Sequence, residues 1–593
     1  MYTKLKSMKK FIYLFIYSII SFTCYPQVGI HTETPAGMLE VTSGNDKKLG
    51  LVLPIVAKLE DVEHVISGEI VKRGTIVFDE QRNTICHKTI TGWSCFNGDT
   101  ITDDGSPINP NEISHPTYVK ASNTSTNARF GYFLSLSADG NTMAVGSFGE
   151  KSNATGINGN QSNASLTNAG AVYVFTRNGT TWTQQAYIKA SNTASNAYFG
   201  SAISLSDDGN TMAVGAWGES SNAKGINGNQ TNTSLDSAGA AYVFTRNGTT
   251  WTQQAYIKAS NTATVYLRFA VTLSISDDGN TLVVGAFGEK SNATGINGNQ
   301  SNASLTNAGA VYVFTRYGTT WTQQAYIKAS NTAEGASFGV FVSLSADGNT
   351  MAVGANYEKS NATGINGNQS DTSLNGAGAA YVFTRNGTTW TQQAYIKASN
   401  TAGDALFGGY LFISADGNTL AVGAAGEKSN ATGINGNQSN NSLANAGAVY
   451  VFTRNGTTWT QQAYIKASNT AANTNFGNVV SLSAKGNTLA VGSYYENSNA
   501  TGIDGDQTNT SASRAGAAYL FTRNGTTWTQ QAYIKASNTA ANARFGAGIA
   551  LSPDGSTLAV SANEEGSNAT GINGNQNNTS TAGAGAVYVS KIR

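Results

Sequence analysis

A unit of about seventy residues is written seven times in this chain. Each copy opens with a phenylalanine, in most copies as Phe-Gly, and continues into a Leu-Ser-x-Asp-Gly-Asn-Thr run and then Ala-Val-Gly. The spacing is 69 residues with one step of 70, and the landmark residues are Phe130, Phe199, Phe269, Phe338, Phe407, Phe476 and Phe545. Self-similarity at a fixed period indicates a repeat architecture, so local patterns are interpreted within that frame.

Each unit contains four runs with the pattern of short β-strands. In the first unit, residues 131–137 and 142–147 alternate apolar with small or polar side chains, and an Asp-Gly pair between them predicts a hairpin. The most apolar run, 170–176, is joined to 181–190 by an Asn-Gly pair. No helical period appears. Four antiparallel strands per unit predict an all-β fold, a seven-bladed β-propeller in which neighbouring blades cover one another's faces.

The two ends of the repeat region predict that the ring is closed. Six units carry a Trp-Thr-Gln-Gln strand, whereas the seventh ends at Arg593, before that strand. The segment Tyr118–Ser122 matches Tyr187–Ser191 of the first unit. We therefore expect an N-terminal strand to complete blade 7, which removes the unpaired edges of an open array, and we assign residues 117–593 to the propeller.

The repeat resembles the FG-GAP repeats of integrin α-subunit propellers and their exported bacterial relatives. The resemblance rests on Phe130-Gly131 and on Val-Gly-Ala at 214–216, and it covers residues 117–593. It implies an integrin-α-like propeller of the exported bacterial type. The calcium loop that the family often carries, Asp-x-Asp-x-Asp-Gly, is reduced here to residues 138–141 with one carboxylate. Because calcium prefers six to eight oxygen ligands, we expect that family site to be lost.

Residues 1–26 have the pattern of an export signal. Four lysines precede an apolar core at 11–22 that is too short to span a bilayer. Cys24 leaves lipidation open as an alternative, although Ser21–Thr23 match a lipobox poorly. No other segment is apolar enough to cross a membrane, so the sequence predicts a secreted or cell-surface protein without a transmembrane segment.

A different small unit lies between the signal and the propeller. Residues 27–98 are expected to form a small β-rich domain, and the start of this region resembles many exported bacterial surface proteins. Residues 99–116, with three prolines, have the composition of a linker. Cys86 and Cys95 are the cysteines that remain after cleavage of the signal, and in an exported chain a disulfide is favoured over a metal pair.

Composition excludes several function classes. Charged residues make up 12% of the chain and the net charge is +1, which gives no electrostatic footprint for nucleic acid or an anionic membrane. The propeller sequence has no Cys and no His, so Cys-His nucleophiles, Ser-His-Asp triads and His-ligated zinc are excluded there.

One glutamate recurs in every unit after the second strand. These residues are Glu150, Glu219, Glu289, Glu358, Glu427, Glu496 and Glu565. A catalytic site needs different residues from different blades, so sevenfold repetition favours a structural role in which each glutamate caps the long loop by accepting backbone N–H groups.

The long polar loop that follows, 150–168 in the first unit, contains a Gly-Ile-Asn-Gly-Asn-Gln run. In the sixth unit this run becomes Asp504-Gly505-Asp506, and alternating Asn and Asp can offer oxygens to calcium. The alternative is that Asn and Gly supply left-handed turn conformations. We expect no cofactor, with weak calcium binding at Asp504 and Asp506 as the alternative.

The units differ most at the start of the innermost strand and just after Val-Gly-Ala. A propeller blade brings both positions toward the axis on the face that carries the long loops. The candidate ligand-binding residues are Arg129, Tyr132, Phe133, Phe148, Tyr198, Trp217, Tyr266, Arg268, Phe287, Tyr410, Tyr494 and Arg544. Exposed aromatics with scattered charges suit glycan or protein recognition, and drift at tolerant positions is the alternative explanation.

The sequence therefore predicts a monomeric, exported or cell-surface propeller that acts as a non-catalytic binding or adhesion module. Its expected partner is an extracellular glycan or protein ligand, with no nucleic acid. Two alternatives stay open: a carbohydrate-active propeller enzyme, and a passive structural surface repeat protein. Paired, non-repeated carboxylates near the axis would favour the enzyme.

Overall fold

The structure is a computed structural model that describes residues 107–262 and 266–592, together with the backbone of four short strands before residue 100. The chain divides into two compact units, 1–100 and 101–593, and each is described by itself. The predicted export signal, most of the predicted small domain and the first part of the predicted linker lie outside the described residues.

In the first unit, four strands form one sheet in the order β1 (Ile55–Val56), β2 (Ile76–Asp79), β3 (Thr84–Lys88) and β4 (Trp93–Cys95). Strand β1 is parallel to β2, and the other two pairs are antiparallel. The backbone register places Cys86 opposite Cys95. Opposed residues of an antiparallel pair have Cα atoms about 4.5–5.5 Å apart, a range that a disulfide spans. The register is compatible with the predicted bond, which stays a prediction.

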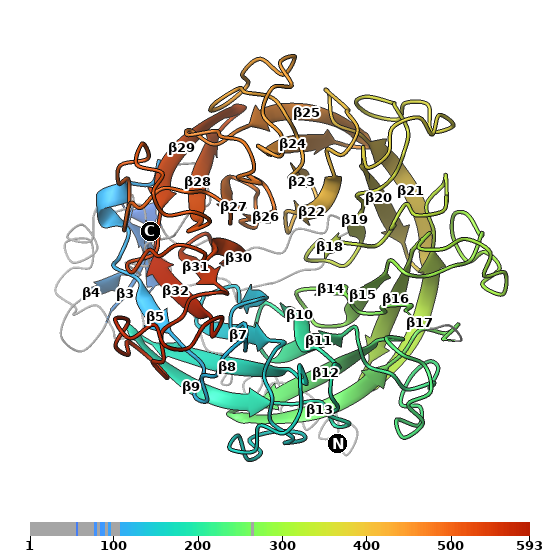
Figure 1. Cartoon of the computed structure of the whole chain (residues 1–593), viewed down its shortest axis with the longest axis horizontal. Coiled ribbons are helices and arrows are strands. Elements are labelled where there is room, and N and C mark those ends of the chain that lie inside the picture. The colour runs from blue at the N-terminus through green and yellow to red at the C-terminus, as the bar shows by residue number, and fades with distance from the viewer. Residues whose placement is uncertain are drawn as a thin grey trace, which may run out of the picture. The chain divides into compact units, whose positions relative to one another are not determined.

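The second unit is a ring of seven four-stranded antiparallel sheets, as predicted (Figure 1). Blade 1 runs outward from the axis as β6 (Leu134–Leu136), β7 (Thr142–Ser147), β8 (Ala171–Asn178) and β9 (Thr181–Ile188). The next five blades repeat this order. Blade 2 contains β10 (Phe199–Leu205), β11 (Thr211–Ala216), β12 (Ala240–Asn247) and β13 (Thr250–Ile257), blade 3 contains β14 (Thr272–Ile275), β15 (Thr281–Ala286), β16 (Ala310–Tyr317) and β17 (Thr320–Ile327), and blade 4 contains β18 (Val342–Leu344), β19 (Thr350–Ala355), β20 (Ala379–Asn386) and β21 (Thr389–Ile396). Blade 5 contains β22 (Phe407–Ile413), β23 (Thr419–Ala424), β24 (Ala448–Asn455) and β25 (Thr458–Ile465), and blade 6 contains β26 (Val479–Leu482), β27 (Thr488–Ser493), β28 (Ala517–Asn524) and β29 (Thr527–Ile534).

Blade 7 is closed by a strand from the other end of the propeller. It contains β30 (Phe545–Leu551), β31 (Thr557–Ala562), β32 (Ala586–Lys591) and, on its outer edge, β5 (Thr117–Val119). Strand β5 pairs antiparallel with β32, with Tyr118 opposite Tyr588. The predicted closure by an N-terminal strand is confirmed.

The residues just before β5 also pack onto the propeller. Ile108 and Ile113, which flank the 3-10 helix η1 (Pro110–Glu112), are buried in the same hydrophobic cluster as Tyr118. The Ile108 N–H donates to Gln531 Oε1 at 3.0 Å. In other blades the equivalent glutamine accepts the next tryptophan's indole N–H. This described end of the predicted linker therefore takes the place of the Trp-Thr-Gln-Gln half-strand that blade 7 lacks.

The hydrophobic core lies between adjacent blades. One cluster joins the fully buried Val172 and Ile188 of blade 1 to Phe199 and Val214 of blade 2. At the same junction Gly170 forms a β-bridge to Phe199, and its φ is +83°. A Cβ atom there would lie 2.1 Å from the Phe199 carbonyl oxygen, so only glycine permits this approach. The repeated glycine and the Phe-Gly landmark are thus two sides of one contact between blades.

Candidate functional site

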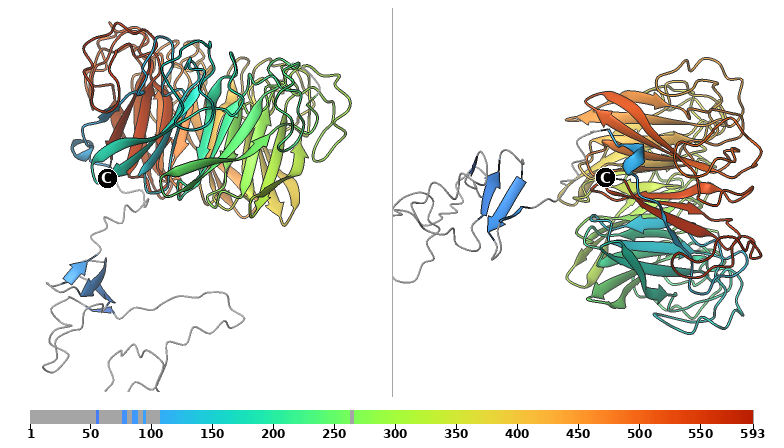
Figure 2. Two further views of the ribbon diagram at one scale, coloured as in Figure 1. Left: turned by 90° about the horizontal axis from the view of Figure 1, so that it is seen from below. Right: turned by 90° about the vertical axis from the view of Figure 1, so that its left-hand side faces the viewer.

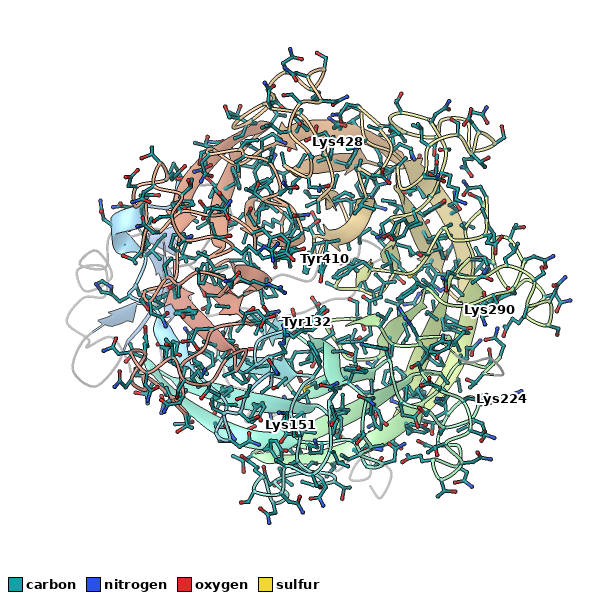
Figure 3. All side chains as sticks on the ribbon, viewed as in Figure 1. Tyr132, Lys151, Lys224, Lys290, Tyr410 and Lys428 are labelled. Atoms are coloured by element: carbon teal, nitrogen blue, oxygen red, sulfur yellow. The ribbon has the colours of Figure 1, made fainter. Side chains whose placement is uncertain are left out.

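The long loops between second and third strands project from one face of the ring (Figure 2). Tyr132 and Tyr410 lie near the axis in the view along it, whereas Lys224 and Lys290 lie toward the periphery (Figure 3). The candidate residues predicted from sequence form three neighbouring groups, apart from Tyr494, whose ring centroid lies 4.1 Å from that of Tyr495, and Tyr266. The Tyr266 side chain is 51% exposed, and its backbone N–H donates to the Asp236 carbonyl.

The first group is a continuous row of side chains across blades 1 to 3, called here the aromatic arc. Its members are Tyr132, Phe148, Tyr198, Trp217, Arg268 and Phe287. Tyr132 meets Phe148 edge-on with ring centroids 4.5 Å apart, and Phe148 lies 5.8 Å from Tyr198. Tyr198 stacks on Trp217 at 4.2 Å with an interplanar angle of 8°.

The arc ends in a cation–π sandwich. The Arg268 guanidinium lies 5.5 Å from the Trp217 ring and 5.1 Å from the Phe287 ring, so it bridges blades 2 and 3. Tyr132 is 40% exposed, and the other members of the arc are half-buried. The side chains of the arc are therefore held in place by contacts with one another, and they still expose part of their surface to solvent.

The second group lies at the axis, consists of Phe133, Phe341 and Tyr410, and is called here the axial plug. Phe133 stacks on Phe341 at 6.4 Å, and Phe341 contacts Tyr410 at 4.6 Å, so blades 1, 4 and 5 meet over the axis. Burial raises the pKa of the Tyr410 hydroxyl well above its usual range. Phe341 was not among the predicted residues, although it occupies the same repeat position as Phe133 and Tyr410.

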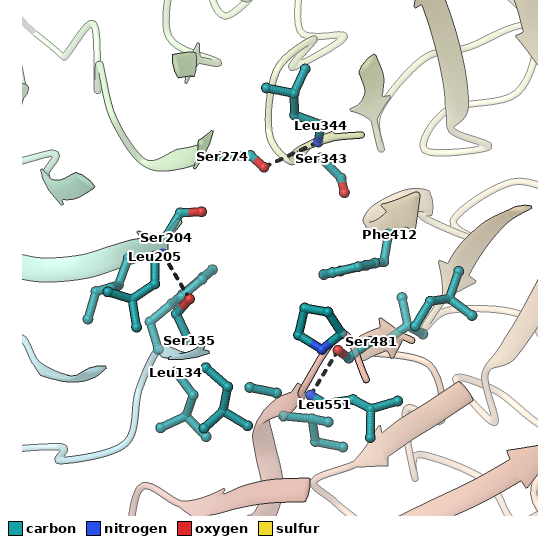
Figure 4. Close-up of a pocket in the computed structure, with 18 of the residues that line it drawn as sticks. Leu134, Ser135, Ser204, Leu205, Ser274, Ser343, Leu344, Phe412, Ser481 and Leu551 are labelled. Carbon is teal, nitrogen blue, oxygen red and sulfur yellow. Dashed lines mark hydrogen bonds between the residues drawn. The ribbon is translucent and has the colours of Figure 1, made fainter. Parts of the chain in front are cut away.

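Behind the plug lies an axial cavity of about 170 Å³ lined by leucine, isoleucine and valine side chains and by serines. Each serine that lines the cavity from an innermost strand accepts a backbone N–H from the next blade. Ser135 accepts from Leu205 at 3.0 Å, and Ser481 accepts from Leu551 at 3.1 Å (Figure 4). The serine hydroxyls are thus engaged in joining the innermost strands.

Two non-repeated carboxyl groups, Asp207 and Asp277, line the far end of this cavity, in the turns between first and second strands. Their side chains are hydrogen-bonded to each other, and the Asp207 N–H donates to the Asp277 carbonyl at 3.1 Å. Burial raises the pKa of both groups, and the hydrogen bond to Asp207 and its charge help to bring that of Asp277 to about 7. Sequence reasoning missed this pair, for which the signal was Asp at a position that other units fill with Ala or Pro.

The third group, called here the arginine cluster, joins blades 6, 7 and 1. It comprises Arg129, Arg514, Arg544, Tyr495 and Glu564. Arg129 and Arg544 both form ion pairs with Glu564 Oε1, the latter at 3.3 Å. The guanidinium carbons of Arg514 and Arg544 lie 5.0 and 5.4 Å from the Tyr495 ring. Burial and the nearby Arg544 charge lower the pKa of Arg129.

Three members of the cluster were not predicted from sequence: Arg514, Tyr495 and Glu564. Tyr495 and Glu564 occupy a position that is glycine in four units, and Arg514 occupies one that is Asn, Ser or Gly in the other six. The prediction followed variation at two repeat positions only. Scoring every position for departure from the repeat would have found all three.

The recurring glutamates are structural, as predicted. Glu150 is buried and accepts the Ser152 N–H at 2.9 Å, which confirms the loop-capping role. Sequence reasoning missed the partner: the fully buried Lys189 ammonium lies 2.6 Å from Glu150 Oε2, and each blade repeats this pair. Desolvation lowers the pKa of Lys189 even though Glu150 raises it. In blade 7 the lysine is Lys120, which follows β5.

The two candidate calcium residues are engaged with the protein's own donors. Asp504, at φ +50°, accepts the Tyr533 N–H at 2.8 Å, the same contact that Asn158 makes with Tyr187. Asp506 Oδ1 accepts the N–H and hydroxyl of Thr508 at 2.8 and 2.7 Å. Within the residues that the structure describes, no group of three or more His, Cys, Asp or Glu side chains could hold a metal ion.

A seven-bladed ring built on Phe-Gly landmarks defines a class of propeller, and comparison with known families agrees. The FG-GAP repeat family matches residues 182–244, 321–383, 459–521 and 528–590. Each match begins at an outer-strand tryptophan and ends in the third strand of the next blade. The protein carries FG-GAP repeats in these four places within a seven-bladed β-propeller, and such repeats are typical of extracellular proteins.

No curated protein matches the chain significantly. Among solved structures, a chain of Kuenenia stuttgartiensis hydrazine synthase is similar at 11% identity with a TM-score of 0.41, over 74% of this chain and 93% of that one. At these values of identity and TM-score, the activity of that protein is not attributed to this chain. Among the described residues, no helix has the length and apolar character needed to cross a membrane.

Proposed function

We propose that the protein is an exported or cell-surface module that binds a glycan or protein ligand on the loop-bearing face, without catalysis. The observation that carries this proposal is the aromatic arc. Five rings and one guanidinium from three blades form a contiguous, partly exposed row, and they occupy positions where otherwise near-identical units differ. Aromatic side chains pre-packed by their neighbours supply large contact area at low entropic cost, as binding hot spots do.

The alternative of a carbohydrate-cleaving enzyme draws on the Asp207–Asp277 pair. Glycoside hydrolysis places two carboxyl groups on either side of the scissile bond, about 5–9.5 Å apart. These two carboxyl groups are hydrogen-bonded to each other, which leaves no room for a glycosidic bond between them. They also line the end of the cavity remote from the aromatic arc. Although paired carboxyl groups near the axis were the feature expected of an enzyme, this pair therefore does not support hydrolysis.

A glycan array probed with the full chain and two variants tests the proposal. Trp217→Ala removes the centre of the arc, and we expect it to weaken binding at least about tenfold, as removal of an aromatic hot spot does. Tyr317→Ala is the matched control, since Tyr317 is 93% exposed at a hairpin tip on the opposite face. Equal binding by the two variants would contradict the proposal, and release of shorter sugars from the array would support the enzyme.

A further inference from the structure

The arginine cluster has a local excess of positive charge on a chain that is otherwise close to neutral. Two guanidinium groups, those of Arg129 and Arg544, form ion pairs with Glu564, and a third, that of Arg514, lies against the Tyr495 ring that Arg544 also contacts. The next residue, Glu565, is already paired with Lys120 at 2.9 Å and is buried. The cluster therefore carries a formal charge of about +2, whereas the whole chain has a net charge of +1.

The cluster is also accessible and incompletely satisfied. The side chains of Arg129 and Arg544 are 29% and 31% exposed, and Arg514 is exposed. The Arg544 Nε–H is buried and has no hydrogen-bond partner among the described residues. Arg514 is held in place by its backbone, whose N–H donates to Asn497 Oδ1 at 2.8 Å. Partly exposed guanidinium groups held by ion pairs and ring contacts match the oxygens of a carboxylate or a sulfate ester.

Aromatic rings lie against these charges. Tyr495 lies within cation–π distance of both Arg514 and Arg544, and its ring centroid is 4.1 Å from that of Tyr494. Tyr132, the start of the aromatic arc, follows Arg129 by three residues, and its N–H donates to the Arg129 carbonyl at 3.1 Å. A sugar ring can stack on tyrosine while an acidic group on that ring binds a guanidinium.

We infer that the arginine cluster is an oxyanion subsite, so that the ligand of the loop-bearing face is an acidic glycan with carboxylate or sulfate groups. This inference rests on the proposed function. The cluster selects the charged residue of the glycan, and the aromatic arc holds adjoining sugar rings. Glu564 competes with the ligand for the same guanidinium groups and so limits the affinity.

Calorimetric titration of the full chain with three oligosaccharides of equal length tests the inference. The probes are an oligogalacturonate with carboxylates, a carrageenan oligosaccharide with sulfates, and an uncharged malto-oligosaccharide. We expect one acidic probe to bind at least about tenfold tighter than the uncharged one, with affinity that falls as salt rises. Whichever acidic probe binds more tightly identifies the oxyanion.

Two charge variants test the cluster itself. We expect Arg514→Gln to weaken binding of the acidic probe about tenfold or more, because a charge-assisted hydrogen bond is lost. Glu564→Gln is expected to tighten binding several-fold, because it removes the competing carboxylate. A purely structural ion-pair cluster would give no gain from that change. Lys224→Gln, the control, removes an exposed positive charge on a long loop outside the cluster and should leave affinity unchanged.

The outcomes separate this inference from the proposed function. Suppose that all probes bind equally, that Trp217→Ala abolishes their binding, and that Arg514→Gln and Glu564→Gln leave it unchanged. The oxyanion subsite is then wrong and the aromatic binding face stands. If Lys224→Gln weakens binding as much as Arg514→Gln, attraction is diffuse and the subsite is again wrong. If no oligosaccharide binds, both the subsite and glycan recognition by the arc are rejected.

Discussion

Individual side chains in this propeller divide into those that the repeat copies and those that it does not. The copied ones, such as the buried glutamate–lysine pair of each blade, hold the ring together. Breaking a buried ion pair leaves one charge without its partner and costs about 3–5 kcal/mol. The uncopied ones, such as Trp217, Arg514 and Asp277, lie at the ends of the axis or around the loop-bearing face. Departure from the repeat therefore marks candidate function at the residue scale.

Glu289→Gln tests the structural role of the copied pairs. It leaves the fully buried Lys328 ammonium, now 2.6 Å from the carboxylate, without a counter-charge. We expect the free energy of unfolding to fall by about 3–5 kcal/mol in chemical denaturation. Adding Lys328→Met should recover part of the loss, since the unpaired charge is then gone. A single variant as stable as the wild type would mean that these pairs contribute little.

Asp277→Asn tests the carboxyl pair through pH. The pKa of Asp277 is about 7 in the folded protein against an ordinary value of 3.8. The folded protein thus binds more protons than the unfolded chain between these pH values, so stability falls as pH rises from about 4 to 7. Asparagine removes this loss. We expect the variant's Tm to exceed that of the wild type by about 1–3 °C at pH 8 and to equal it near pH 4.

The neighbouring Asp278 supplies a control of opposite sign. Burial raises the pKa of Asp278, but the hydrogen bonds from Ser276 and Asn280 together lower it by more than burial raises it, so the net shift is downward. Asp278→Asn should therefore lower Tm at pH 8. Thermal scans in which Asp277→Asn also lowers Tm at pH 8 would contradict the raised pKa.

At the scale of elements, the strand that closes blade 7 is much shorter than the outer strand of the other blades. Strand β5 has three residues, whereas its counterpart β9 has eight. Contacts outside the sheet also keep β5 in place. The Tyr118 N–H donates to Asn573 Oδ1 at 3.0 Å, and the Lys120 ammonium forms an ion pair with Glu565 at 2.9 Å. The buried Ile108 and Ile113 cover the outer edge that the short strand leaves.

Removing this strand should therefore open the ring. A chain that begins at Asn123 loses the β5 ladder, the Lys120 ion pair and the burial of Tyr118 and Val119, each side chain worth about 1.5–3 kcal/mol. We expect it to melt well below a chain that begins at Pro107, and to dimerise or aggregate through the exposed edge of β32 in light scattering. Fusing Trp-Thr-Gln-Gln-Ala-Tyr-Ile-Lys-Ala-Ser after Ile592 should restore stability. An equally stable, monomeric short chain would show that β5 is dispensable.

At the scale of the whole molecule, the ring is held by contacts that each blade makes with the next, and we propose that no metal ion is needed for it. The loops that were candidates for calcium already satisfy their carboxylates internally, as Asp504 does with the Tyr533 N–H. We expect a chelator to shift the propeller's Tm by less than about 2 °C, because removing a tightly bound ion would shift it further. A larger shift, reversed by added calcium, would assign the metal to these loops, and Asp506→Asn should then abolish it.

The sequence by itself determined the blade number, the strand order and the closure of blade 7. Periodicity and turn residues act locally and identically in each copy, so one unit predicts all seven. The loop-capping glutamate was predictable for the same reason. Its partner was not, because Lys189 is brought to Glu150 only when the fourth strand folds back along the blade.

Many residues of the site were predicted from sequence, but which of them contact one another was decided by the tertiary structure. The ring brings Arg129 and Arg544 onto one carboxylate although the two residues lie at opposite ends of the propeller sequence. It likewise brings Phe133 of blade 1 against Phe341 of blade 4 across the axis. Sequence order predicts neighbours within a blade and between successive blades. Contacts across the axis, and contacts between blades 7 and 1 where the ring closes, depend on how the seven twisted sheets form the ring. The closed ring determines which loop ends meet.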